Sequence, residues 1–401
     1  MRMSKQIQDA YVVAAVRTPV AKRNGAFRHV RPDDMLATVL RALVAKVPNL
    51  DASQIGDVVT GCAMPEAEQG MNVARIGALL AGLPDAVPGI TINRFCASGL
   101  QAVADAASRI RLGEADVMIA AGTESMSAMP QIMGNKVSLN PDIFARDENL
   151  AIAYGMGLTA EKVAQQWQVS REDQDAFAVE SHRRACAAIA AGHFADEIAP
   201  YAVRAHVPGE AGTVRMVERV LENDEGPRAD ASLERLAKLR PVFAARGSVT
   251  AGNSSQMSDG AGAVLLMSEA AVKRYDVKPI ARFAGYAVAG VPPQVMGIGP
   301  VEAIPRALAL AGVSLGDIAW TELNEAFAAQ ALAVMRQLDM DPARVNPLGG
   351  AIALGHPLGA TGAIRTATLM SAMQRDPALR YGMISMCIGT GMGAAGVFER
   401  V

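Results

Sequence analysis

The chain has 401 residues, and 38 Lys and Arg residues against 40 Asp and Glu residues give a formal net charge of −2. This balance argues against a general nucleic-acid binder or a protein held on anionic membranes, because both need a basic surface. Hydrophobic residues make up 51% of the chain and charged residues 19%, which excludes a disordered protein and indicates two or three domains with large cores.

The N-terminal segment carries no sign of export, because its first ten residues mix charged and polar side chains and lack the apolar stretch of a secretion signal. No run of about 18 uncharged apolar residues occurs, so we expect no helix that spans a bilayer. Cys62, Cys96, Cys186 and Cys387 are too few and too scattered for a disulfide framework. These features predict a soluble protein of a reducing compartment, the cytoplasm.

Short apolar runs without strict polar alternation predict strands that are covered on both faces. In chain order these runs are residues 11–16, 117–121, 263–267 and 383–386. Helical patterns separate them, which places the protein in the α/β class. Between about residues 131 and 246 charged helices, one of them opened by Ser170, alternate with polar loops. We expect this stretch to be a partly solvated insertion that carries substrate recognition.

Two distant stretches of the chain follow one plan. The first has Cys96 before a helical pattern at residues 99–107, followed by an apolar strand and a glycine turn at Gly122. The second has a glycine-rich loop before a helical pattern at residues 362–370, followed by the last apolar strand and a glycine turn. The similarity of the two stretches predicts a duplicated α/β half. The alternative is a chance similarity between two parts of an α/β chain.

Cys96 stands in residues 93–100 (NRFCASGL), where an apolar segment ends and a helical pattern begins. A thiol at a helix N-terminus meets the positive end of the dipole and unpaired backbone N–H groups, which favour the thiolate. The position suits a nucleophile, and a buried structural cysteine is the alternative that position alone leaves open.

Further side chains could take part in chemistry. Cys387 follows the last apolar strand in a turn that includes Gly389, where glycines let backbone N–H groups approach a ligand as an oxyanion hole requires. His356 stands in a loop fixed by glycines and a proline, which suits either a general base or a structural histidine. Asn324 comes between a strand and a helix, so a helix cap is its simpler interpretation and the orientation of a water or substrate oxygen the other.

Metal chemistry has little support in the sequence. No C-x-x-C pair occurs, and no two histidines are four residues apart. His182 and His193 lie in a charged helical stretch, so we expect both at the surface. We therefore predict no metal site.

These motifs, in this order, resemble those of the thiolase family. The match runs nearly from end to end and includes residues 16–19 (VRTP), 156–161 (MGLTAE), 250–255 (TAGNSS) and 258–261 (SDGA). Residues 286–293 and 296–300 resemble the degradative 3-ketoacyl-CoA thiolases in particular. The family implies duplicated βαβαβαββ halves in a layered α/β/α/β/α core with an inserted loop domain.

The resemblance also implies where the domains lie. The N-terminal half would comprise residues 1–130 plus 247–278, and the C-terminal half residues 279–401. The inserted loop domain, which would bind CoA, would comprise residues 131–246.

Thiolases cleave a 3-ketoacyl-CoA with CoA to acetyl-CoA and a shortened acyl-CoA, or run the condensation in reverse. The resemblance implies that Cys96 is the nucleophile that carries the acyl group and that His356 activates it. Asn324 would hold a water that stabilises an enolate together with His356. Cys387, as an acid or base with a pKa close to neutral, would move the proton at the enolate carbon. The backbone N–H groups of Cys96 and Gly389 would form a second oxyanion hole.

The family further implies that CoA is a co-substrate and that no cofactor is bound permanently. Arg228 would face the nucleotide end of CoA, Ser255 would hydrogen-bond its pantetheine arm, and Met156 would line the acyl pocket. The residues by themselves favour a solvated arginine and a core methionine. The expected partners are acyl-CoA and CoA, a second copy in a homodimer or homotetramer, and a β-oxidation multienzyme complex, with no nucleic acid and no membrane insertion.

Two positions depart from the family pattern. Ala97 replaces a common serine beside the nucleophile, and Gly155 precedes Met156 where short-chain biosynthetic members tend to carry histidine. The second departure favours longer substrates. We therefore predict a 3-ketoacyl-CoA thiolase of fatty-acid β-oxidation, an acyltransferase, with an acetyl-CoA acetyltransferase that forms acetoacetyl-CoA as the alternative.

Two other classes share the expected fold. A non-catalytic thiolase-like lipid carrier would lack one or more catalytic residues, whereas Cys96, Asn324, His356 and Cys387 are all present. A carrier-protein-dependent condensing synthase would have histidine or asparagine in place of the second cysteine, so Cys387 argues against it.

Overall fold

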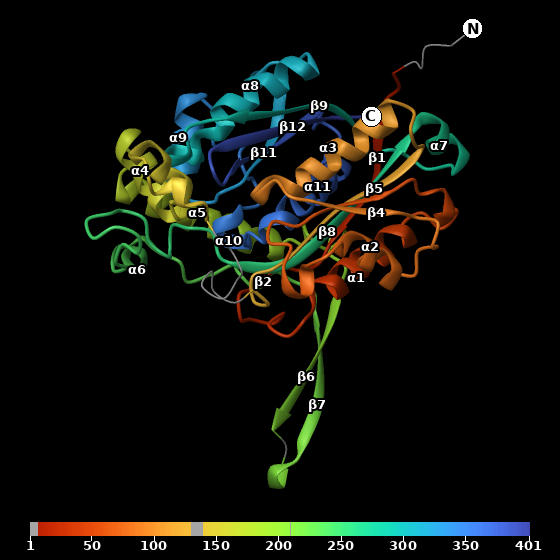
Figure 1. Cartoon of the computed structure of the whole chain (residues 1–401), viewed down its shortest axis with the longest axis horizontal. Helices are drawn as coiled ribbons and strands as arrows, with labels where there is room; N and C mark the ends of the chain where they lie inside the picture. Colours follow the sequence, from red (N-terminus) through yellow and green to blue (C-terminus); the bar gives the residue numbers. More distant parts are fainter. Residues whose placement is uncertain (1–6, 130–138, 209) are drawn as a thin grey trace.

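The computed structural model describes residues 7–129, 139–208 and 210–401, in which it forms a ten-stranded sheet and a separate two-stranded one (Figure 1). The first six residues and the predicted domain boundary at residues 130 and 131 fall outside these ranges. No helix in the described ranges has the length and apolar character needed to cross a membrane.

The first half of the chain forms one side of the large sheet, in the strand order β4-β3-β5-β8-β1. Strands β3, β4 and β5 are parallel, whereas β8 runs antiparallel to both β5 and β1. The strands are β1 (Ala10–Arg17), β2 (Ala21–Lys22), β3 (Val58–Gly61), β4 (Gly89–Ile92), β5 (Val117–Ser125) and β8 (Ser258–Ser268). The helices are α1 (Pro32–Ala45), α2 (Val73–Leu80), α3 (Ser98–Arg111) and α7 (Glu269–Arg274).

The second half repeats this plan in the order β10-β11-β12-β9, and a parallel bridge from Thr321 to Val345 stands where the first half has β4. The two half-sheets join where β1 and β9 pair antiparallel. The strands are β9 (Ala281–Gly290), β10 (Ile318–Leu323), β11 (Tyr381–Ile388) and β12 (Met392–Arg400). The helices are α8 (Gly299–Ala311), α9 (Ala328–Gln337), α10 (Ala351–Leu354) and α11 (Leu358–Arg375). The predicted duplication is confirmed.

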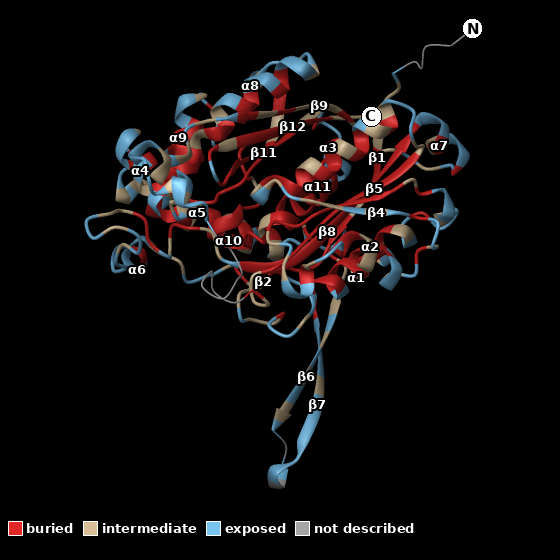
Figure 2. Ribbon diagram, in the orientation of Figure 1, coloured by how far each residue is buried: buried red, intermediate tan, exposed pale blue. Residues whose placement is uncertain are grey.

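Helices α3 and α11 lie between the two half-sheets and complete five layers. Met118 and Ile119 are adjacent on β5 and point to opposite faces, as strand geometry requires. Met118 packs in the central layer, together with Val103 of α3, Leu369 of α11 and Ile384 of β11. The outer faces are covered by α1 and α2 on the first half-sheet and by α8 and α9 on the second. The predicted α/β/α/β/α order is confirmed, and Figure 2 shows the inner strands β5 and β8 and the helix α11 buried.

Small residues bring α3 and α11 together at their first turns. A Cβ on Gly362 would overlap the backbone nitrogen of Leu100, and a Cβ on Gly99 would come within 2.7 Å of the nitrogen of Ala363. The predicted turn at Gly122 is wrong, because Gly122 lies inside β5, where a Cβ would meet the carbonyl of Gly359 at 2.5 Å. Glycine is needed there for the close approach of α11 to the strand.

The chain between β5 and β8 forms the insertion, whereas a short turn joins β11 to β12 in the second half. The insertion contains α4 (Met156–Gln166), α5 (Arg171–Ala190), β6 (Tyr201–Pro208), β7 (Val214–Leu221) and α6 (Leu233–Ala237). Ser170 caps α5 as predicted, because its Oγ accepts from the backbone N–H of Asp173 at 3.1 Å. The hairpin β6–β7 projects from the body and is largely exposed (Figures 1 and 2).

Candidate active site

Cys96 lies in a single 3-10 turn, Phe95–Ala97, that leads directly into α3. Phe95 has a φ of 45°, a left-handed conformation that bulky residues rarely adopt. Asn93 supports it: its Oδ1 accepts from the N–H of Phe95 at 2.8 Å, and its Nδ2 donates to the carbonyl of Ala63 at 3.0 Å. In this turn Cys96 is partly exposed as a residue.

His356 is buried in the loop between α10 and α11, so it precedes α11 as Cys96 precedes α3. Its Nε2 lies 3.4 Å from Nδ2 of Asn324, and its Nδ1 lies 2.6 Å from Oγ1 of Thr361. With the amide in this orientation, Nε2 accepts and Nδ1 carries the proton. Burial and the nearby guanidinium of Arg365 lower the pKa of His356 to about 3. The ring is therefore neutral at pH 7 and can act as a base.

Asn324 is not the helix cap that its sequence position favours, because α9 begins at Ala328 and Phe327 is its N-cap. Asn324 is buried, and its backbone N–H donates to the carbonyl of Ser385 at 2.8 Å. Its Oδ1 has no hydrogen-bond partner among the residues that the structure describes. A buried amide oxygen without a partner is costly, so this atom is suited to hold a water or a ligand.

Cys387 is buried near the end of β11 and not in the turn where the sequence placed it. Burial raises its pKa, and the nearby Cys96 sulfur raises it further, so the two sulfurs interact electrostatically. The backbone N–H groups of Gly389 and Cys96 act on the sulfur of Cys96 in the direction that lowers its pKa. Both predicted cysteines and both predicted N–H groups therefore meet at one place.

The protonation state of both cysteines differs from the expectation. Burial raises the pKa of Cys96 to about 11, although the N–H groups of Gly389 and Cys96 act in the opposite direction, and the charge of Glu124 adds to the rise. The expected thiolate at the helix start is wrong, because loss of water outweighs the local donors. The near-neutral pKa expected for Cys387 is wrong for the same reason. Both sulfurs rest as thiols, and the nucleophile needs a base.

Met156 is the first residue of α4 and borders this site. Its sulfur would lie 3.5 Å from a Cβ on Gly389, and it packs against an apolar cluster that includes Met296, Phe327 and Cys387. The predicted acyl-pocket residue therefore lies beside Gly389 and the apolar cluster that includes Cys387.

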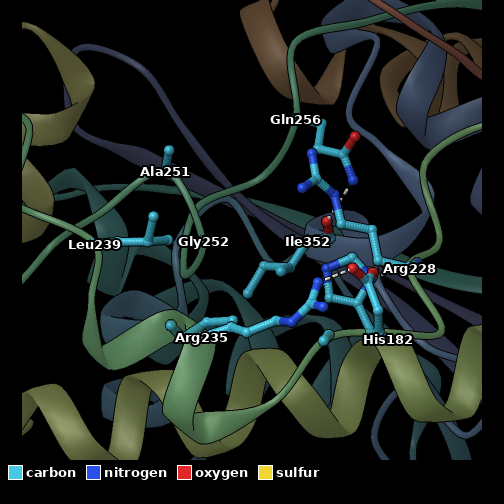
Figure 3. Close-up of a pocket in the computed structure, with 11 residues that line it drawn as sticks. His182, Arg228, Arg235, Leu239, Ala251, Gly252, Gln256 and Ile352 are labelled. Atoms are coloured by element: carbon cyan, nitrogen blue, oxygen red, sulfur yellow. Dashed lines mark hydrogen bonds and ion pairs between the residues drawn. The ribbon is translucent and has the colours of Figure 1, made fainter.

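A pocket of about 220 Å³ opens between the insertion and the second half (Figure 3). It is lined by His182, Arg228, Asp230, Ala231, Arg235, Leu236, Leu239, Ala251, Gly252, Gln256 and Ile352. The backbone N–H of Arg228 donates to Nδ1 of His182 at 3.2 Å. The prediction that His182 lies at the surface is wrong: it is buried, and burial together with Arg228 lowers its pKa to about 4. The pocket thus combines two arginines, one of them paired with Asp230, with apolar walls.

Ser255 lies between this pocket and the catalytic candidates. Its backbone N–H donates to the carbonyl of Ala326 at 3.0 Å, and the neighbouring Gln256 lines the pocket. One residue further, Met257 forms a parallel bridge with His356. This segment therefore connects the lining of the pocket with the backbone of His356.

Two residues that act on His356 were not anticipated. Thr361, in the first turn of α11, hydrogen-bonds the ring, and its position five residues after the histidine was visible in the sequence. Arg365 follows one turn later and lowers the pKa of the ring. Burial of Arg365 could not be read from the sequence, since arginine is mostly exposed. In the described ranges, no group of three or more His, Cys, Asp or Glu side chains could hold a metal ion.

Comparison with known proteins agrees with this arrangement. The family models for the thiolase N-terminal and C-terminal domains match residues 10–270 and 277–400. The chain is 50% identical to a 3-ketoacyl-CoA thiolase of Bacillus subtilis (strain 168), over 98% of this chain and 100% of that protein.

Two solved structures resemble the chain over nearly its full length. The human mitochondrial 3-ketoacyl-CoA thiolase superposes with a TM-score of 0.88 at 38% identity, over 98% of this chain and 99% of that chain. The Bacillus anthracis acetyl-CoA acetyltransferase superposes with a TM-score of 0.88 at 38% identity, over 99% and 100%.

Proposed function

The chain belongs to the thiolase family and is an acyltransferase, and on this premise we propose that it cleaves 3-ketoacyl-CoA with CoA to acetyl-CoA and a shortened acyl-CoA. The observation that carries the proposal is the meeting of two protonated sulfurs and backbone N–H donors at the junction where α3 and α11 begin, with a neutral imidazole at the start of α11. A carrier without catalysis has no need of two such thiols.

In the first half-reaction, the Cys96 thiol gives its proton to Nε2 of His356 as its sulfur attacks the keto carbon. The bond between the keto carbon and the α-carbon breaks, and its electron pair leaves on an acetyl-CoA enolate. Cys387 protonates that carbon and is left as a thiolate. In the second half-reaction, Cys387 takes the proton of the incoming CoA thiol, and the CoA sulfur attacks the thioester on Cys96. Cys96 leaves and recovers its proton from His356.

Each charged intermediate has donors that match it. His356 and a water on Oδ1 of Asn324 would stabilise the enolate, and the unpartnered Oδ1 supports this assignment. The N–H groups of Cys96 and Gly389 would stabilise the tetrahedral intermediates of acyl transfer, which their contact with the Cys96 sulfur supports.

CoA would occupy the pocket beside α6 as a co-substrate, with no cofactor bound permanently. The guanidinium of Arg228 suits the phosphates, Ser255 the pantetheine arm and Met156 the acyl chain. We further propose that the protein acts in fatty-acid β-oxidation, in the cytoplasm and as a homo-oligomer. The name of the bacterial relative of 50% identity, a 3-ketoacyl-CoA thiolase, supports the role in β-oxidation.

The test is the rate of thiolysis by purified protein on acetoacetyl-CoA, 3-ketooctanoyl-CoA and 3-ketohexadecanoyl-CoA. We expect turnover of the longer substrates. A rate confined to acetoacetyl-CoA would favour the alternative, an acetyl-CoA acetyltransferase, which the similarity to the Bacillus anthracis structure supports. If none of the three substrates is cleaved, the result would favour a non-catalytic lipid carrier.

A further inference from the structure

Glu124, near the end of β5, is a fully buried carboxylate to which the proposed reaction assigns no role. Within the described ranges, N–H groups from two parts of the chain donate to it. They are Ala63 N at 2.7 Å and Gly359 N at 2.8 Å to Oε2, and Met64 N at 3.1 Å and Gln69 Nε2 at 2.6 Å to Oε1. Donors of this kind match an ionised carboxylate, which only accepts.

Ala63 connects this carboxylate to the turn of Cys96. Its N–H donates to Glu124, and its carbonyl accepts from Nδ2 of Asn93 at 3.0 Å. Oδ1 of Asn93 then accepts from the N–H of Phe95, the residue with positive φ before Cys96. A short series of hydrogen bonds therefore runs from Glu124 to the turn that presents the sulfur.

Gly359 connects the same carboxylate to the loop of His356. It lies in the first turn of α11, three residues after the histidine, and its N–H donates to Oε2. A Cβ at this glycine would lie 2.6 Å from the nitrogen of Ala63 and 2.8 Å from Oε2. The loop after β3 and the start of α11 thus touch each other, and the carboxylate binds both.

The negative charge of Glu124 also acts on sulfur. It contributes to the raised pKa of Cys96 and, behind burial, to that of Cys62, whose sulfur lies 3.7 Å from Oε1. Burial raises the pKa of Glu124 itself to about 7, against the backbone donors and Gln69.

We propose that Glu124 is a positioning residue, which fixes the Cys96 turn and the His356 loop relative to each other across the two halves of the chain. It acts through Ala63 and Gly359 and touches no substrate. The inference rests on the proposed thiolase function, since it assigns Glu124 a role in that reaction.

Two variants separate the reach of the side chain from its charge. Glu124→Gln removes the charge and turns an NH₂ group towards N–H donors, whereas Glu124→Asp keeps the charge but is too short to bind both loops. We expect both to lower kcat on the order of tenfold to a hundredfold, with a smaller change in KM. The alkylation rate of Cys96 by iodoacetamide at pH 8, followed by mass spectrometry, should rise in Glu124→Gln and stay near wild type in Glu124→Asp.

Asp57→Asn is the matched control, because Asp57 is a buried carboxylate that pairs with Arg109 in the last turn of α3, at the opposite end of that helix from Cys96. It should change neither kcat of the folded protein nor the alkylation rate. Glu124 variants that match wild type in kcat and in alkylation rate would overturn the proposal, as would a loss of stability alone.

If neither Glu124 variant folds, Asn93→Ala decides, since Asn93 is exposed and joins Ala63 to Phe95. We expect a lower kcat at unchanged thermal stability, and an unchanged kcat would contradict the proposal. A wild-type protein without thiolysis would refute the function instead, and the alkylation rates would still report on Glu124.

Discussion

The two cysteines of the site differ in access more than in acidity. Burial raises the pKa of both, yet Cys96 is partly exposed and receives the N–H of Gly389, whereas Cys387 is 1% exposed within β11. Of the two cysteines, Cys96 is therefore the better placed to meet a substrate carbon, and the N–H of Gly389 is near the oxyanion that would form there. Cys387 is placed to exchange a proton with a carbon that is already bound.

This difference predicts a separation of the half-reactions in Cys387→Ala. The variant should still accept an acyl group from acyl-CoA on Cys96, because the nucleophile and His356 remain. Condensation of two acetyl-CoA molecules should fall by about 10²-fold or more, as expected for loss of a general acid–base group. Acyl-transfer and condensation rates, measured separately, check this, and an equal loss of both would contradict the division of roles.

His356 should remain neutral throughout the physiological range. Its pKa is lowered to about 3, below the ordinary value, so the uncharged ring is favoured and protonation requires acid. We expect its ring NMR signals to stay constant between about pH 5 and pH 8, where an ordinary histidine titrates. A His356→Asn spectrum assigns the signals. A midpoint inside that interval would show that the imidazole is not desolvated as described.

At the residue scale, the sequence identifies the reactive groups but not their chemical state. Cys96, His356 and Cys387 stood out by motif, whereas their pKa values depend on burial by distant segments, which no local pattern contains. A helix cap was the simpler of two interpretations of Asn324, because a strand and a helix flank it, and the later start of α9 could not be read from the pattern. The prediction for His182 was wrong for a similar reason, since Arg228, from a later part of the insertion, lies next to it.

The elements that bring the site together are α3 and α11. Each follows a catalytic candidate, and the two helices meet backbone to backbone at Gly99 and Gly362. This contact fixes the distance between the two helix starts, and hence between Cys96 and His356.

Gly362→Ala should therefore be strongly destabilising. The added methyl group would overlap the backbone nitrogen of Leu100, which cannot move without shifting α3. We expect a loss of at least about 3 kcal/mol in the free energy of unfolding, at the upper end for overpacking, measured by urea denaturation. Gly316→Ala is the control, because a Cβ there meets only Oγ of Ser314 at 3.7 Å. Equal stability of the two variants would contradict the packing described.

Strand positions were predictable from apolar runs, and all four runs lie within β1, β5, β8 and β11. Gly122 was misread as a turn because glycine marks both turns and close backbone approaches. Only the position of α11 against β5 distinguishes a turn from a close approach at this glycine. That contact joins the two halves of the chain, so no local pattern shows it.

At the scale of the whole molecule, a buried ion-pair cluster fastens the insertion to the first half-sheet. Arg17 at the end of β1 donates from Nε to Glu197 at 2.6 Å and from Nη1 to Asp224 at 2.7 Å, and all three side chains are buried. Glu197 and Asp224 flank the hairpin β6–β7, so one arginine holds both of its ends.

Arg17→Met should destabilise the protein by about 3–5 kcal/mol, because it leaves two buried carboxylates without their cation. Arg204→Met, which breaks an exposed pair with Glu218 on the hairpin, should cost less than about 1 kcal/mol. Urea unfolding of both variants measures the difference. Similar values for the two would show that the cluster does not anchor the insertion.

The family resemblance implied the layers, and the residues indicated an insertion, but neither predicted how the insertion is placed. The hairpin β6–β7 has no distinctive alternation, since its exposed face carries Val214 and Met216 beside charged residues. The pocket beside α6 also combines residues from the insertion with Ile352 of the second half, and only the folded chain brings these together.

The central claim is that Cys96 carries the acyl group while Cys387 exchanges the proton. Peptide mapping by mass spectrometry after reaction with a 3-ketoacyl-CoA, without added CoA, tests it most directly. We predict an acyl adduct on Cys96 in the wild type and none in Cys96→Ser. An adduct on Cys387, or a labelled Cys96→Ser protein, would contradict the account.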